Sequence, residues 1–154
     1  MWWILFIPSG LMTSLEEHKR KIDEHLEELG EAIDAGIEKR PIAVGFHCSA
    51  CSIEMLEVYL HKLNKISIGK VIKHDWFKPI QEGQKVEPLA ERMIGAEFSR
   101  KTEIFSLIHK IEAKRDKLIY GKPSESEIRQ TLENFNKLKK IFLEELKKFG
   151  VELE

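Results

Sequence analysis

Apolar residues recur at every third or fourth position along four long stretches of this 154-residue chain, which is the spacing of one face of an α-helix. The first stretch follows a capping box, in which the Ser14 hydroxyl and the Glu17 carboxylate each accept a free backbone N–H. Gly36 and Pro41 bracket its end. The stripe on this predicted surface helix consists of Leu15, His18, Ile22, Leu26, Leu29, Ile33 and Ile37.

The second stretch, residues 42–66, is apolar around most of its circumference, which predicts a helix in the middle of a bundle. One polar wedge interrupts it, because His47, Glu54 and His61 fall within about 40° of one another on a regular helix. Gly69 is expected to end this element.

The third stretch is predicted to run from about Glu91 or Glu97 to Ile119, and a second capping box at residues 124–127 opens the fourth. Residues 70–77 are interpreted as a short helix or turn. Because no stretch of any length alternates as a strand does, the sequence predicts an all-α fold. We expect an antiparallel bundle of four main helices with a short helix or turn near 70–77.

The composition is typical of one folded domain, which we place at residues 12–154, with 42% hydrophobic and 33% charged residues in the chain. Residues 1–11 are an apolar extension with two open explanations. Met12 is the true start, or the extension is a strand or apolar tail that packs on a neighbour. Its lack of a basic beginning makes it a poor signal peptide.

No run approaches the ~20 apolar residues of a membrane span, so no membrane association is expected. Cys48 and Cys51 do not make a disulfide framework, which predicts a cytoplasmic protein. They form a C-x-x-C next to His47, a possible metal ligand, but no second such pair follows. Burial in the core is the favoured interpretation, and neither a metal site nor a cofactor is predicted. The Lys- and Glu-rich composition favours a heat-adapted source.

The net charge of −1 gives no global attraction to nucleic acid. Residues 69–122 nevertheless carry twelve basic and eight acidic side chains, a balance of +4. This excess permits a local anion site, although ordinary variation among solvated helix faces also accounts for it.

Arg115 is the least expected residue of the third helix, because it falls inside the apolar stripe. An arginine in that position must be paired, must extend to the edge of the core, or must face an interface. An ion pair with Glu112 or Glu54 that fixes helix packing is one interpretation. The stripe consists of Ile104, Ile108, Ile111, Leu118 and Ile119.

The heptapeptide Arg115-Asp-Lys-Leu-Ile-Tyr-Gly121 resembles the Arg-polar-x-x-aliphatic-His signature of the HEPN superfamily. The resemblance implies a small helical domain that is usually dimeric. Many members of that superfamily are ribonucleases, and some pair with a nucleotidyltransferase as toxin and antitoxin. Tyr120 stands where the family has its histidine.

In the enzymes that the motif resembles, the arginine would hold the scissile phosphate and the histidine would act as general acid or base. Tyrosine side chains titrate near pH ~10, so Tyr120 is a poor base but can donate a hydrogen bond or stack on a nucleobase. Arg115 and Tyr120 lie about 140° apart on a regular helix. They converge only if the helix ends between them or if two protomers meet across a dimer.

His74 and Trp76, between Lys73 and Lys78, add an imidazole and a large aromatic ring. Aromatic rings interleaved with lysines suit base stacking, although rings at the end of a bundle more often cover its core. The candidate nucleotide- or RNA-binding residues are therefore Arg115, Asp116, Tyr120, His74 and Trp76.

Three functions remain open, and a homodimer is expected through the helices that carry Arg115. The first is a catalytically degenerate HEPN-like module that binds RNA or a nucleotide, or that partners a nucleotidyltransferase. The second is a ribonuclease in which His109 or His74 replaces the missing histidine. The third is a purely structural oligomer with a buried Arg–Glu pair.

Overall fold

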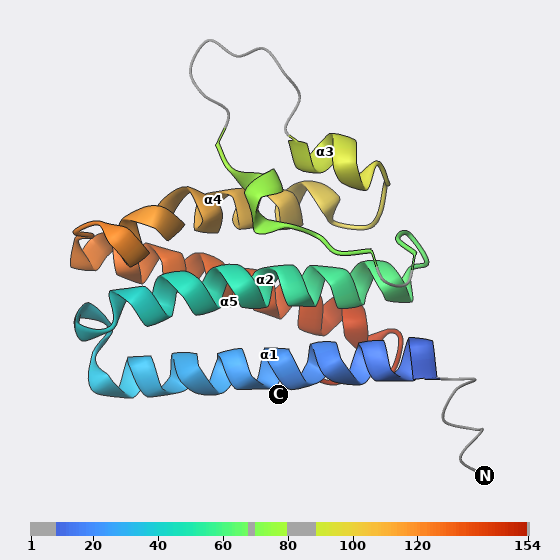
Figure 1. The fold of residues 1–154 in the computed structure, drawn as a ribbon, viewed down its shortest axis with the longest axis horizontal. Helices are drawn as coiled ribbons and strands as arrows, with labels where there is room; N and C mark the ends of the chain where they lie inside the picture. Colours follow the sequence, from blue (N-terminus) through green and yellow to red (C-terminus); the bar gives the residue numbers. More distant parts are fainter. Residues whose placement is uncertain (1–8, 68–69, 80–88, 154) are drawn as a thin grey trace.

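The computed structural model describes residues 9–67, 70–79 and 89–153, which form an all-helical bundle (Figure 1). Its long helices run alternately in opposite directions, so the predicted all-α antiparallel fold is confirmed. The long helices are α1 (Ser9–Ala35), α2 (Pro41–Lys62), α4 (Lys101–Tyr120) and α5 (Glu125–Lys147). The short elements are α3 (Leu89–Ile94) and the 3-10 helices η2 (Ile37–Lys39) and η3 (His74–Phe77).

Helix α2 is the centre of the bundle, as its apolar circumference predicts, and it packs against α1, α4 and α5. Pro41 is its first residue, where the missing N–H of proline leaves no donor unpaired. Cys48 and Cys51 are buried in it as free thiols, which confirms that they pack in the core. The helix ends earlier than predicted, at Lys62, and Asn64 then takes a left-handed conformation with φ 57°. Gly69 lies outside the described residues.

Helix α1 begins earlier than predicted, at Ser9. Ser14 and Glu17 therefore lie inside the helix, and the capping box predicted for them is wrong. The apolar extension predicted at residues 1–11 lies outside the described residues up to residue 8, and its last three residues belong to α1. The end of the helix is as expected, because Gly36 follows it with φ 98°, a conformation that favours glycine.

The predicted third helix is two helices, α3 and α4, so both starting points proposed for it are wrong. Gly95 directly follows the last residue of α3 and has φ 58°, and Arg100 directly precedes α4 and has φ 62°. A helix cannot continue through these left-handed residues. The capping box at the start of α5 is confirmed, since the Glu127 N–H donates to Ser124 Oγ at 3.1 Å and the Ser124 N–H donates to Glu127 Oε1 at 3.0 Å.

The short helix predicted near 70–77 is η3, which lies across α2 and α4 (Figure 1). Its aromatic residues Trp76 and Phe77 are buried, and Phe77 makes edge-on ring contacts with Phe105 and His109 of α4. This packing places His74 beside the middle of α4. Within the parts of the chain that the structure describes, no helix has the length and apolar character needed to cross a membrane.

Candidate functional site

Helices α2 and α4 approach each other closely at Gly45. A Cβ atom at this position would lie 2.7 Å from Leu118 Cβ and 3.3 Å from a side-chain carbon of Ile119. Only glycine allows this separation without a shift of one helix. The contact brings the C-terminal half of α4, which carries Arg115, against the N-terminal half of α2.

Arg115 belongs to the core-facing side of α4, as its position in the apolar stripe predicts, and only 15% of its side chain is exposed. Its one ion pair among the described residues is with the neighbouring Asp116, at 3.5 Å from Nη1 to Oδ1. The predicted pairs with Glu112 or Glu54 are therefore wrong. The bundle shields most of the Arg115 side chain from solvent. Most of its guanidinium N–H groups nevertheless have no carboxylate partner among the described residues.

The Glu112 carboxylate contacts side chains other than Arg115, and only 2% of the Glu112 side chain is exposed. Its Oε2 accepts a hydrogen bond from Ser49 Oγ at 3.0 Å, and its Oε1 lies 2.7 Å from His74 Nδ1. The carboxylate thus joins α2, α4 and η3, and both of its oxygens have a polar partner, as burial requires. His74 Nδ1 also lies 3.3 Å from the exposed Asp75 Oδ1. With Nδ1 used in this way, His74 Nε2 is the ring nitrogen left for a ligand.

Along α4, one stripe of polar side chains becomes more exposed towards the C-terminal end of the helix. It consists of His109, Glu112, Asp116 and Tyr120. Its first two members are held by η3, because His109 Nδ1 donates to the Phe77 carbonyl at 2.7 Å and Glu112 meets His74. Its last two lie beyond η3, and Tyr120 is 78% exposed. The open end of the stripe is therefore where a ligand has access.

The structure brings some of the predicted site residues together and separates others. Arg115 and Asp116 are in contact, and His74 lies one helical turn away, on Glu112. Tyr120 is the last residue of an unbroken helix, so it does not converge with Arg115 within one chain, and of the two routes to convergence only a dimer remains. Trp76 is only 7% exposed, so its ring covers the core in this structure.

A second polar region, the α1–α2 seam, contains four of the six histidines: His18 and His25 of α1, and His47 and His61 of α2. The polar wedge predicted on α2 forms one side of it. His25 Nδ1 and His47 Nδ1 lie 2.8 Å apart, and the rings of His18 and His61 stack with centroids 5.9 Å apart. Glu54, the third member of the wedge, hydrogen-bonds to His18.

The α1 side of this seam was not predicted, because His18 was counted with the apolar stripe of that helix. His25 lies outside that stripe, and the sequence analysis assigned it no role. The signal that could have found the seam is the seven-residue spacing of His18 and His25, which places both on one face of α1.

Burial sets most of the protonation states in the α1–α2 seam. It lowers the pKa of His25, His47 and His61 below the usual value of 6.5, and the nearby His47 lowers the pKa of His25 further. His18 is the exception, because its hydrogen bond to Glu54 raises its pKa against the effect of burial. The seam therefore combines neutral imidazoles with one histidine that favours a positive charge.

Two groups of side chains in the described part of the chain have the donor atoms and spacing to hold a metal ion, although the sequence predicted no metal site. They are His18, Glu54 and Glu57 in the α1–α2 seam, and His74, Asp75 and Glu112 beside η3. The cysteines belong to neither group. Burial raises the pKa of the Cys51 thiol to about 12 and that of Cys48 well above its ordinary value, so both thiols stay protonated.

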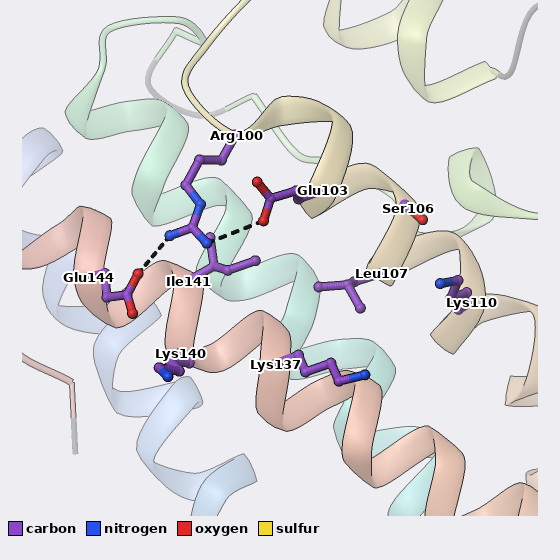
Figure 2. A pocket seen from close by; sticks show the side chains of 9 residues that line it. All are labelled: Arg100, Glu103, Ser106, Leu107, Lys110, Lys137, Lys140, Ile141 and Glu144. Atoms are coloured by element: carbon purple, nitrogen blue, oxygen red, sulfur yellow. Dashed lines mark hydrogen bonds and ion pairs between the residues drawn. The ribbon is translucent and has the colours of Figure 1, made fainter.

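An open groove between α4 and α5 carries the lysines Lys110, Lys137 and Lys140 (Figure 2). Figure 2 shows Arg100 at one end of the groove, bound to Glu144 at 2.7 Å and to Glu103 at 3.2 Å. Lys110 lies about 120° around α4 from Asp116. The groove is therefore separate from the Arg115 site. The carboxylates of Glu103 and Glu144 in the groove weaken its attraction for anions.

No family model, no curated protein and no solved structure matches this chain. The resemblance to the HEPN superfamily consequently depends on the motif at residues 115–121, and the function must be inferred from the side chains themselves.

Proposed function

We propose that this protein is a HEPN-like, catalytically degenerate module that binds the phosphate of an RNA or a nucleotide through Arg115. One observation carries the proposal. Arg115 is mostly shielded by the bundle, but its only ion pair among the described residues is a 3.5 Å contact with the exposed Asp116. A guanidinium that is held in place by packing and has free N–H groups can bind a phosphate through two parallel hydrogen bonds.

Tyr120 supports binding without cleavage. Its ring is exposed at the end of α4, where it can stack on a nucleobase next to the phosphate. It also occupies the place of the acid–base histidine in the motif, and a tyrosine at that position supplies no efficient proton transfer near neutral pH.

The test is binding of a 5′-phosphorylated, fluorescently labelled RNA and of ATP, with RNA cleavage followed in the same samples. We expect Arg115→Ala to weaken binding by at least about tenfold, because it removes a charge-assisted bidentate contact. Arg115→Lys should retain part of the affinity. Arg129→Ala is the matched control, since Arg129 is exposed on α5 and pairs with Glu125 at 2.7 Å. Equal binding by the wild type and Arg115→Ala would refute the proposal.

A homodimer through the face that carries Arg115 is part of the proposal. Ile42 and Phe46 of α2 are 59% and 43% exposed, and they lie on one side of Gly45, where α4 packs, with Phe46 also against His25 and His47. Large exposed apolar side chains next to a candidate site favour a protein contact there. Two such faces in contact would also bring Arg115 of each protomer near the other protomer's motif. Light scattering of the wild type and Phe46→Glu tests this, and a monomeric wild type would refute it.

A ribonuclease is the second candidate, and the contact between His74 and Glu112 favours it. A buried carboxylate that holds Nδ1 of a histidine orients the ring and leaves Nε2 to move a proton. Cleavage of the RNA by the wild type, lost in both His74→Gln and Arg115→Ala, would establish this function in place of the binding module.

The partner and location that we propose follow from the same resemblance. A HEPN-like module of this kind would act in the cytoplasm, and a nucleotidyltransferase would be its protein partner. Co-purification with the product of an adjacent nucleotidyltransferase gene, lost in Phe46→Glu or Tyr120→Ala, would support that partnership. Normal co-purification of both variants would place the contact elsewhere.

A further inference from the structure

His18 of α1 lies between two carboxylates of α2. Its Nδ1 contacts Glu54 Oε2, and its Nε2 lies 3.4 Å from Glu57 Oε2. The two glutamates are three positions apart, so they project from one side of α2. One donor atom from each of the three side chains lies within 4.8 Å of the other two.

A neutral imidazole and two ionised carboxylates cannot satisfy all of these contacts. A neutral imidazole carries one N–H, so it can donate to only one of two carboxylates. At the other ring nitrogen a lone pair would face the lone pairs of an oxygen. A proton on that nitrogen or on the facing carboxyl, or a metal ion bound at that nitrogen, removes this repulsion.

The three side chains are shielded and held in place by groups outside the cluster. Glu57 is the most buried, with 7% of its side chain exposed, and the N–H of Ile72 donates to its Oε1 at 2.9 Å. Its Oε2 is left facing His18. Lys21 Nζ lies 3.9 Å from Glu54 Oε1, which leaves Glu54 Oε2 turned inward. A hydrogen bond from a surrounding shell, such as the one that Ile72 donates to Glu57, fixes ligand orientation in metal sites.

We propose that His18, Glu54 and Glu57 bind one divalent transition-metal ion of the zinc class, which links α1 to α2. One imidazole and two carboxylates match the ligands that Zn²⁺ accepts, and three protein ligands leave a fourth position for water. Ligand atoms of a tetrahedral site with bonds of about 2.0 Å lie about 3.3 Å apart. Because an imidazole binds an ion through one nitrogen, the His18 ring and the Glu54 carboxylate, which now meet at Nδ1, must turn so that both carboxylates reach the ion at Nε2. Calcium and magnesium prefer sites of oxygen ligands alone. This site is independent of the function proposed for Arg115.

The test uses the full chain, stripped of metal with a chelator and titrated with Co²⁺ by absorption and with Zn²⁺ by calorimetry. We expect one ion per chain, a visible Co²⁺ spectrum of low coordination number, and a higher melting temperature with Zn²⁺. Glu57→Gln and His18→Gln should each weaken binding by at least about tenfold. His74→Gln removes the ring of the other group of potential ligands beside η3 and is the matched control, so its affinity should equal that of the wild type.

Circular dichroism shows whether each variant is folded, and Glu54→Gln, which changes a more exposed side chain, replaces any variant that is not. The proposal is overturned if the wild type binds neither ion, because the cluster then holds only a proton. It is equally overturned if Glu57→Gln and His18→Gln bind as the wild type does, or if His74→Gln alone loses the ion.

Discussion

His25 Nδ1 and His47 Nδ1 lie 2.8 Å apart across the α1–α2 seam, so one ring donates its proton and the other accepts it. Two protonated rings cannot make this hydrogen bond, since each nitrogen would then carry a hydrogen. The contact therefore requires that at least one of the two rings be neutral, and it connects the packing of α1 on α2 to the protonation of these histidines.

The pH dependence of stability follows from the lowered pKa values of His25 and His47. Below pH 6.5 the unfolded chain takes up protons that the folded seam resists, so the free energy of unfolding falls as the pH is lowered. Above pH 6.5 this contribution is complete. We expect the loss between about pH 7.5 and about pH 5.5 to be smaller in the variant that carries both His25→Gln and His47→Gln.

Urea unfolding at the two pH values measures this loss for the wild type and the double variant. His18 acts in the opposite direction, because its raised pKa favours the folded state at low pH, but it is present in both chains and cancels in the difference. A difference of zero between the two chains would show that the pair does not resist protonation.

The close approach of α2 and α4 makes Gly45→Ala destabilising. The new methyl group would lie 2.7 Å from Leu118 Cβ, so one of the helices must move, at a cost of about 1–3 kcal/mol in the free energy of unfolding. Gly30→Ala is the control, because Gly30 lies inside α1 with nothing within 4 Å of the added carbon.

Alanine at Gly30 should stabilise the chain by roughly 0.5–1 kcal/mol, since glycine is the less favourable residue inside a helix. Urea unfolding of the two variants compares them directly. If both alanines stabilise the protein to the same degree, α2 and α4 are not in close contact at Gly45.

Periodicity along the chain predicted the long helices and the central place of α2, because each follows from residues that are neighbours in the sequence. It did not predict the break between α3 and α4. That break depends on the left-handed conformations of Gly95 and Arg100, and arginine gives no signal for such a conformation. The late start predicted for α1 and the late end predicted for α2 have a different cause, because these predictions followed motifs that occur inside or beyond the real helices.

The candidate sites show a similar division. The sequence placed Arg115 on the inner side of its helix, but could not show which carboxylates remain to pair with it, because Glu112 and Glu54 are taken by His74 and His18 from other elements. Such pairings depend on how far one helix is shifted along another, and the spacing of residues within a helix does not contain that shift.

The capping box of α5 predicts a local stabilisation. Ser124→Ala removes the acceptor for the Glu127 N–H and should lower the free energy of unfolding by about 1 kcal/mol. Ser126→Ala, two positions later on the exposed first turn, removes the same hydroxyl without a capping role and should change it by less than about 0.5 kcal/mol. Equal effects at Ser124 and Ser126, measured by thermal and urea unfolding, would argue against the cap.

The bond between His74 and Glu112 predicts a strong energetic coupling between η3 and α4. Glu112→Gln should cost about 1–3 kcal/mol, because the amide cannot accept both the Ser49 hydroxyl and the His74 N–H as the carboxylate does. A double-mutant cycle with His74→Gln isolates the pair, and we expect an interaction free energy of about 0.5–3 kcal/mol. Urea unfolding of the wild type, the two single variants and the double variant supplies the four values.

The contact between His74 and Asp75 is the internal control for this cycle, since it joins the same imidazole to an exposed carboxylate at 3.3 Å. A cycle of His74→Gln with Asp75→Asn should give at most about 1 kcal/mol, because water screens a pair at the surface. We therefore expect the larger coupling free energy in the cycle with Glu112, because Glu112 is buried and Asp75 is exposed. Equal coupling in the two cycles, or additive effects in the first, would mean that Glu112 does not hold His74 in place, and the ribonuclease alternative would lose the carboxylate that orients its base.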